Sequence, residues 1–162
     1  MSARRDRLTE VDQSLQENLD RFHVEIRPDQ AQVPIAIDAL IDYLSSQPQA
    51  EQLPAMDVRL VLAEALNNVI EHAMKDREDG QITVELRAAG DGAHIGIQDN
   101  GDPLPELRLP CKDMALMTPE DLDTADLPEG GFGWAMICEL SASVSYRRSG
   151  GLNNLMILIP LS

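Results

Sequence analysis

The chain has 162 residues, of which 43% are hydrophobic and only 3% aromatic, and its formal net charge is −15 at pH 7. This hydrophobic content excludes a disordered chain and suits one domain with a core of aliphatic side chains. A surface this acidic repels nucleic acid and anionic membranes, so we expect neither as a direct partner.

No segment has the pattern of a targeting or membrane-spanning sequence. Residues 1–8 are basic but lack the apolar stretch of a signal peptide, and the longest apolar run, residues 155–159, is too short to span a bilayer. The two cysteines, Cys111 and Cys138, form no CxxC pair and suit a reducing compartment. We therefore expect a cytoplasmic protein whose two thiols are chemically inert.

The first half of the chain predicts an extension, a strand and two helices. Residues 1–20 are polar, with apolar residues at helical intervals, and indicate an N-terminal extension before the main domain at 21–162. Residues 22–26 alternate apolar and polar side chains, as in a half-buried strand that ends before Pro28. Apolar residues recur at helical spacing over 34–44 and again over 54–75.

The second half predicts a hairpin, an irregular segment, a helix and two more strands. Alternation over residues 81–89 and 93–99, around a Gly-Asp-Gly turn, predicts two paired strands. Prolines and acidic residues break every period over about 102–129, which suggests a functional lid. A helix over 130–140 and strands over 142–148 and 154–160 follow. The order predicts an α+β fold: a two-layer α/β sandwich in which a mostly antiparallel mixed sheet carries helices on one face.

The helix predicted at 54–75 carries a polar stripe with two interpretations. At about 100° per residue, five polar side chains lie on one side of this helix: Glu64, Asn68, Glu71, His72 and Lys75. Such a side normally faces solvent, and a lone histidine there more often packs or caps than binds a ligand. Asparagine in mid-helix, however, has weak helix propensity, and an amide oxygen near a carboxylate suits Mg²⁺ that is also held by phosphates.

An aspartate interrupts the buried side of the second hairpin strand. Asp99 follows Ala93, Ile95 and Ile97 on the same side of that strand. It could cap the following turn, since Asp-Asn-Gly is a common turn sequence. Alternatively, it is a buried carboxylate that accepts a hydrogen bond from a ligand donor such as an adenine amino group, with Gly101 allowing the ligand close to the backbone.

A glycine-rich stretch opens the next predicted helix, with Gly130, Gly131 and Gly133 close together. Glycines at a helix start expose N–H groups where the helix dipole also favours phosphate. A flexible hinge is the alternative, and a glycine-rich stretch alone is weak evidence. Glycine inside a helix lowers its stability, however, so another requirement is expected to keep these residues there.

Taken in order, these three motifs resemble the N, G1 and G2 boxes of the GHKL (Bergerat fold) ATPases. The motifs are Glu64-x-x-x-Asn68-x-x-x-His72, Asp99-x-Gly101 and Gly130-Gly131-x-Gly133. Within that family, the sequence is most similar to the bacterial anti-sigma factor serine-protein kinases, which regulate by partner switching. The resemblance covers roughly residues 20–160, and it implies ATP and Mg²⁺ as cofactors.

The resemblance also implies a role for each residue. Glu64 would be the general base that activates a seryl hydroxyl, and Asn68 would bind Mg²⁺ that bridges the ATP phosphates. Asp99 would accept a hydrogen bond from the adenine amino group, with Gly101 beside the adenine. The glycines Gly130, Gly131 and Gly133 would meet the phosphates, and His72 completes the N box.

Two residues depart from the family pattern. Pro103 stands where the broader family has the second glycine of its G1 box, and Trp134 stands where leucine is commoner. Both put phosphate transfer in question more than nucleotide binding.

The resemblance leaves three hypotheses for function. The first is an anti-sigma factor that phosphorylates a small antagonist protein on serine, binds a sigma factor or another regulatory protein, and forms a homodimer. The second is an ATP-binding switch with weak or absent kinase activity. The third, the catalytic domain of a sensor histidine kinase, is disfavoured because no helix pair for dimerisation and phosphoacceptance is evident.

Overall fold

The elements follow one another in the predicted order. The computed structural model describes residues 21–111 and 131–162. They form β1 (Arg21–Ile26), α2 (Gln32–Ser45), η1 (Ala50–Gln52), α3 (Ala55–Asn68), η2 (Val69–Ala73), β2 (Ile82–Ala89), β3 (Gly92–Asp99), η3 (Pro105–Leu107), α5 (Gly131–Leu140), β4 (Ser143–Ser149) and β5 (Leu152–Pro160).

The strands form a single open sheet in the order β1-β2-β3-β5-β4. All four strand pairs are antiparallel, so the sheet predicted as mostly antiparallel is wholly so within the described residues. Because β3 pairs with β5, the last strand of the chain but one lies at an edge and the last strand lies inside. This arrangement places Asp99 opposite Ile82 on one side and Asn153 on the other.

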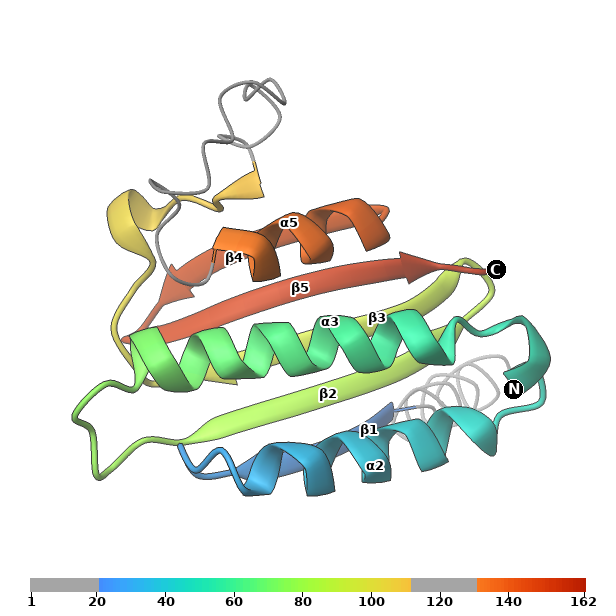
Figure 1. Ribbon diagram of the computed structural model, residues 1–162, viewed down its shortest axis with the longest axis horizontal. Helices are drawn as coiled ribbons and strands as arrows, with labels where there is room; N and C mark the ends of the chain where they lie inside the picture. The colour runs from blue at the N-terminus through green and yellow to red at the C-terminus, as the bar shows by residue number, and fades with distance from the viewer. Residues whose placement is uncertain (1–20, 112–130) are drawn as a thin grey trace, which may run out of the picture.

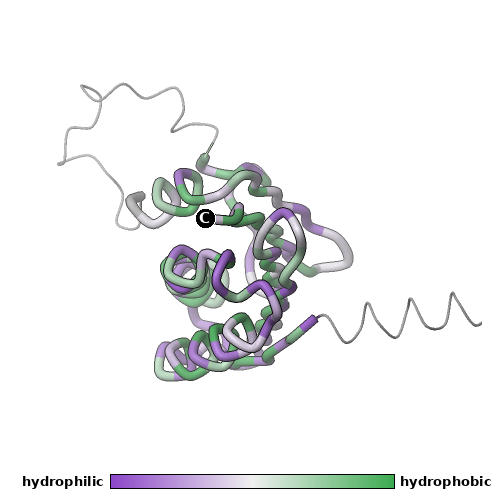
Figure 2. The backbone as a smooth tube through the Cα atoms, turned by 90° about the vertical axis from the view of Figure 1, so that its right-hand side faces the viewer, coloured by the Kyte–Doolittle hydropathy of each residue, from purple (hydrophilic) through white to green (hydrophobic). Residues whose placement is uncertain are grey.

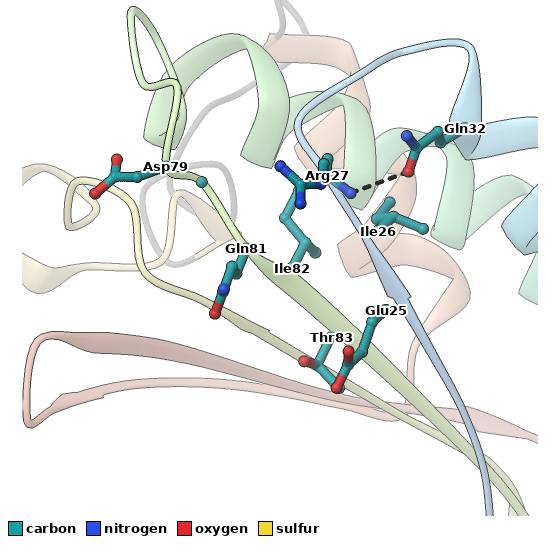
Figure 3. Close-up of a pocket in the computed structure, with 9 residues that line it drawn as sticks. Glu25, Ile26, Arg27, Gln32, Asp79, Gln81, Ile82 and Thr83 are labelled. Carbon is teal, nitrogen blue, oxygen red and sulfur yellow. Dashed lines mark hydrogen bonds between the residues drawn. The ribbon is translucent and has the colours of Figure 1, made fainter.

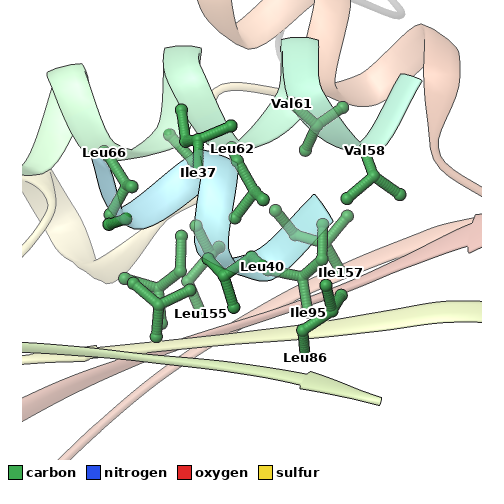
Figure 4. Close-up of a cluster of buried hydrophobic side chains, with 14 of the residues drawn as sticks. Ile37, Leu40, Val58, Val61, Leu62, Leu66, Leu86, Ile95, Leu155 and Ile157 are labelled. Carbon is green, nitrogen blue, oxygen red and sulfur yellow. The ribbon is translucent and has the colours of Figure 1, made fainter. Parts of the chain in front are cut away.

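Helices α2, α3 and α5 cover one face of this sheet (Figure 1). Seen from the side, they stand in a row against the strands (Figure 2). The inward residues of the strands and the apolar sides of the helices fill the space between the two layers with aliphatic side chains (Figure 4). Leu40, Leu62, Leu86 and Ile95 are all completely buried. The two-layer α+β architecture predicted from the alternation and helical spacing is therefore confirmed.

The end of the long helix differs from the prediction of a regular helix up to about residue 75. The α-helix ends at Asn68, and η2 continues it as five residues of π-helix. The backbone N–H of Met74 donates to the carbonyl of Val69 at 2.9 Å, which is the i→i+5 bond of such a turn. The wider turn changes the direction of every side chain after Asn68, so the angular spacing used in the prediction does not hold there.

The cysteines also differ from the prediction of two free, inert thiols. Cys111 and Cys138 form a disulfide that links the segment after η3 to α5, with the two Cα atoms 5.7 Å apart. This separation lies within the range that a disulfide requires. The spacing of 27 residues gives no local signal of pairing, because only the tertiary fold brings these two positions together.

Three expectations concern residues outside the described ones: the N-terminal extension at 1–20, most of the lid at 102–129, and Gly130. Within the described parts of the chain, none of the helices has the length and apolar character that crossing a bilayer requires.

Candidate functional site

The residues predicted as the general base and the metal ligand meet one of the predicted glycines where α3 and α5 pack together. Glu64 and Asn68 lie one turn apart on α3, and Gly133 lies in the first turn of α5. A Cβ atom placed on Gly133 would lie 2.5 Å from Glu64 Oε2 and 3.7 Å from Asn68 Nδ2. The absence of a side chain at this position is therefore what lets the α5 backbone approach both polar groups.

Asn68 has an unusual environment for a polar side chain. Only 9% of it is exposed, and its Nδ2 is buried without a hydrogen-bond partner among the described residues. An unsatisfied buried donor costs about 1–3 kcal/mol, and native proteins contain few of them. Nδ2 is therefore available to an acceptor atom of a ligand.

This junction fits the Mg²⁺ and phosphate groups that the sequence pattern implies. An amide and a carboxylate supply the oxygen ligands that Mg²⁺ prefers, and Glu64 retains partial exposure. The unpaired Nδ2 of Asn68 is a hydrogen-bond donor that fits a phosphate oxygen, whereas the metal would be bound by the Oδ1 of the same amide. Asn68 is the residue that would hold the metal.

The second predicted motif forms a buried polar corner at the end of β3. Asp99 is 4% exposed, and its Oδ1 accepts hydrogen bonds from the Gly101 backbone N–H and from Asn153 Nδ2, each at 2.8 Å. No described residue donates to Oδ2, which is not fully buried. The two interpretations of Asp99 are therefore compatible, because Oδ1 caps the turn and Oδ2 is left for a ligand donor.

Burial raises the pKa of Asp99, whereas the hydrogen bonds from Asn153 and Gly101 and the charges of Arg148 and Arg77 lower it. Burial has the largest effect, so the pKa lies above its usual value of 3.8. A carboxylate held in this way is ready to accept a donor that replaces the solvation it has lost.

The Asp99 corner is attached directly to the end of the helix that carries Glu64 and Asn68. The Asp102 backbone N–H donates to the Ala73 carbonyl at 2.8 Å, and a Cβ placed on Gly101 would lie 2.9 Å from the Ala73 Cβ. Gly101 thus permits the turn to pack against the last residue of η2. The helix and the turn form one continuous wall, with Glu64 and Asn68 in one part and Asp99 in the other.

Three residues of this corner were not predicted from the sequence. They are Tyr146 and Arg148 of β4 and Asn153 of β5, which connect to one another and to Asp99. Asn153 is 4% exposed and precedes Leu155, Ile157 and Ile159 on the inward side of its strand. A polar residue at a core-facing position was the available signal, but the predicted strand began one residue too late to include it.

The remaining predicted residues have less defined surroundings. His72 is exposed and makes no hydrogen bond or ion pair with the described residues, while its neighbour Glu71 accepts a hydrogen bond from Gln30 Nε2 at 3.4 Å. Gly131 is the first residue of α5. Pro103 is exposed, and Trp134 packs partly buried against the core.

A separate pocket lies between the end of β1 and the start of β2, where Ile82 pairs with Asp99 (Figure 3). Its volume is about 460 Å³. Its charged lining residues are of both signs, and one of its edges is held by the hydrogen bond from the Arg27 backbone N–H to Gln32 Oε1 at 3.0 Å. None of the predicted site residues lines it, so we do not assign it to the nucleotide.

Comparison with known proteins identifies the family. Residues 1–159 match the family model described as the histidine kinase-like ATPase domain. The chain belongs to this family. The resemblance to GHKL-type ATPases inferred from the three motifs is thereby confirmed, and the domain is of an ATPase and kinase type.

Among curated proteins, this ATPase domain is similar to serine-protein kinases named RsbW. The RsbW kinase of Listeria innocua serovar 6a is 40% identical over 45 residues, which are 28% of this chain and 29% of that kinase. The RsbW kinase of Oceanobacillus iheyensis is 29% identical over 100 residues, 62% of each chain. The chain therefore matches 29% of the length of the first of these relatives and 62% of the length of the second.

Among solved structures, the ATPase domain is similar to the histidine kinase domain from the Erythrobacter litoralis EL346 blue-light activated histidine kinase. The two share 18% sequence identity with a TM-score of 0.47, over 84% of this chain and 62% of that one.

Proposed function

We propose that this protein is an ATP-dependent serine-protein kinase and anti-sigma factor. It phosphorylates a small antagonist protein on serine, and this reaction controls its binding to a sigma factor or a similar regulatory protein. The observation that carries the proposal is the contact of Gly133 with Glu64 and with the unpaired amide of Asn68. The similarity to serine-protein kinases supports the choice of serine as the acceptor.

The adenine end of ATP is assigned to the Asp99 corner. The free Oδ2 of Asp99 accepts a hydrogen bond from the adenine amino group, while Oδ1 remains bound to Gly101 and Asn153. The lack of a side chain on Gly101 leaves the turn compact beside the base. The phosphates extend along the wall toward Asn68, where Gly131 and Gly133 provide backbone N–H groups at the start of α5.

The transfer step is assigned to Glu64. Its carboxylate accepts the proton of the seryl hydroxyl as the hydroxyl oxygen bonds to the γ-phosphorus, and the bond from that phosphorus to the β-γ bridging oxygen breaks, releasing ADP. Mg²⁺ held at Asn68 would neutralise charge on the phosphate oxygens. We assign His72, which is exposed on η2, to the outer end of the site.

A second candidate function is an ATP-binding switch without phosphate transfer. The observation that favours it is the same close packing of Gly133 on Glu64, because the backbone of α5 covers part of the carboxylate that would act as base. In this case the nucleotide would alter partner binding, and Glu64 would be dispensable.

Transfer of labelled phosphate separates the two candidates. The purified chain would be incubated with γ-labelled ATP, Mg²⁺ and a co-encoded small antagonist, alongside the variants Glu64→Ala and Asn68→Ala. Glu139→Gln, which removes an exposed carboxylate on the neighbouring helix α5, is the matched control. We expect labelled serine from the wild type and the control and none from the other two. ATP binding without transfer would favour the switch, and a lack of ATP binding would rule out both candidates.

A further inference from the structure

Arg148 of β4 bridges two of the polar groups that shape the Asp99 corner. Its guanidinium NH1 donates to the Gly101 carbonyl at 2.9 Å and to Asn153 Oδ1 at 2.7 Å. Tyr146, two residues earlier on β4, donates from its hydroxyl to the same Oδ1 at 2.6 Å and accepts from the Leu104 N–H at 3.1 Å. The edge strand therefore holds the turn after β3 from one side.

These two donors fix the orientation of the Asn153 amide. Because Oδ1 receives hydrogen bonds from both Arg148 and Tyr146, the nitrogen must face the opposite way. There Nδ2 donates to Asp99 Oδ1 at 2.8 Å and to the Asp102 carbonyl at 2.9 Å. A half-turn of the amide would place its nitrogen against two donors and its oxygen against a carboxylate. The fixed amide always occupies Asp99 Oδ1 and leaves Oδ2 to a ligand.

The charges around Asp99 make Arg148 distinct from its neighbours. Two cations act on Asp99: Arg148 from β4, and Arg77 from the segment after η2. Arg77 is paired with Asp102, at 3.1 Å between NH2 and Oδ1, whereas Arg148 has no carboxylate within 4.0 Å among the described residues. The other groups that contact Asp99, the Gly101 backbone N–H and the Asn153 amide, are uncharged.

We propose that Arg148 is a positioning residue that sets the selectivity of this site for nucleotides whose base carries an amino group. It acts by locking Asn153 and the Gly101 carbonyl, so that Asp99 presents one free, negatively charged oxygen to the base. This inference rests on the proposed assignment of Asp99 to adenine. Arg148 would act through the Gly101 carbonyl and Asn153 Oδ1, which its guanidinium contacts.

Nucleotide affinity measured across pH tests this role. Non-hydrolysable analogues of ATP and of inosine triphosphate, which has a carbonyl in place of the amino group, would be titrated into the wild type and into Arg148→Gln, Arg148→Lys and Tyr146→Phe. The glutamine variant keeps a hydrogen-bonding group but removes the charge. Tyr146→Phe is the matched control, because it removes one neutral donor to the same Asn153 oxygen.

We expect Arg148→Gln to weaken binding of the ATP analogue about tenfold, the effect of losing one charge-assisted hydrogen bond. Binding of the inosine analogue should change little, so selectivity falls. Loss of the positive charge makes the Asp99 carboxylate easier to protonate, so the fall in ATP affinity on acidification should begin at a higher pH than in the wild type. Arg148→Lys should restore the pH profile, and Tyr146→Phe should not shift it.

If Arg148→Gln binds nucleotides with the affinity, selectivity and pH profile of the wild type, the role of Arg148 is contradicted, whereas the proposed function is not. If the wild type binds no nucleotide, the proposed function fails and the inference fails with it. A carbon NMR titration of the Asp99 carboxyl group provides a readout that is independent of activity. Its midpoint should rise in Arg148→Gln, and an unchanged midpoint would contradict the role of the charge.

Discussion

Gly133 of α5 lies so close to Glu64 of α3 that a Cβ atom on the glycine would come within 2.5 Å of a carboxylate oxygen. The contact involves the mobile end of a side chain, so an added methyl group could be accommodated by moving Glu64. Such a movement would cost little stability but would displace the proposed general base. The backbone position of Gly133 therefore affects where the proposed general base can lie.

Gly133→Ala is the corresponding test. Replacing glycine by alanine within a helix contributes about 0.5–1 kcal/mol of stability, which offsets the cost of moving Glu64. We expect an unfolding free energy close to that of the wild type in urea, together with a loss of phosphate transfer of tenfold or more. Full transfer activity in this variant would show that the position of Glu64 is not critical.

Asn68→Leu should separate stability from nucleotide binding. The change removes a buried amide whose nitrogen has no partner and replaces it with an apolar group of similar size. We expect the free energy of unfolding to rise by about 1 kcal/mol and Mg²⁺-dependent ATP binding to be lost. Urea denaturation and nucleotide titration measure the two effects. A less stable variant would indicate that Asn68 has a structural role that the unpaired nitrogen does not reveal.

The unfolding free energy of Asp99→Asn should differ from that of the wild type by an amount that depends on pH. The folded protein raises the pKa of Asp99 above 3.8, so it binds the proton more tightly than the unfolded chain does. The native state therefore loses stability as pH rises from 3.8 through the folded pKa, because the buried carboxylate becomes charged.

The asparagine variant avoids this loss, while its side-chain oxygen can still accept from Gly101 and Asn153. We expect it to be more stable than the wild type at neutral pH, and the difference to shrink as pH falls toward 3.8, the usual value for the carboxyl group. Denaturation curves at several pH values measure this trend. A variant that is less stable at neutral pH by an amount independent of pH would contradict it.

The disulfide between Cys111 and Cys138 should stabilise the folded chain through the loop it closes. For a separation of 27 residues, the chain-entropy model predicts a contribution of about 3.5 kcal/mol. Reduction should lower the unfolding free energy by this order, and the double variant Cys111→Ser with Cys138→Ser should not respond to reductant. Titration of thiols in the denatured, unreduced protein should find none. Two free thiols would contradict the pairing.

The sequence predicted the architecture well because the strands and helices each obey one simple period. Ile82, Val84 and Leu86 alternate with polar residues and are buried as expected, and the helical spacing of Val58, Val61 and Leu62 leads to the same core. These patterns depend on local geometry and on burial alone. The order of elements and the antiparallel pairing of the hairpin follow from them.

What the sequence did not predict depends on contacts between distant segments. The π-helical turn after Asn68 has no period of its own, so the angular spacing used to place His72 on the same face as Glu64 does not apply there. Asn153 acquires its meaning only when β5 is placed beside β3, opposite Asp99. The disulfide likewise requires α5 to meet the segment after η3.

The most direct test of the account is serine phosphorylation by the wild type and by Glu64→Gln at saturating ATP and Mg²⁺. This substitution preserves the size of the side chain and removes only its ability to accept the proton. Loss of a general base typically slows transfer by about 10²–10⁴-fold. We predict such a loss of transfer in Glu64→Gln, with ATP affinity retained. Equal transfer rates in the two proteins would contradict the role of Glu64, and the absence of transfer from the wild type to its antagonist would contradict the kinase assignment itself.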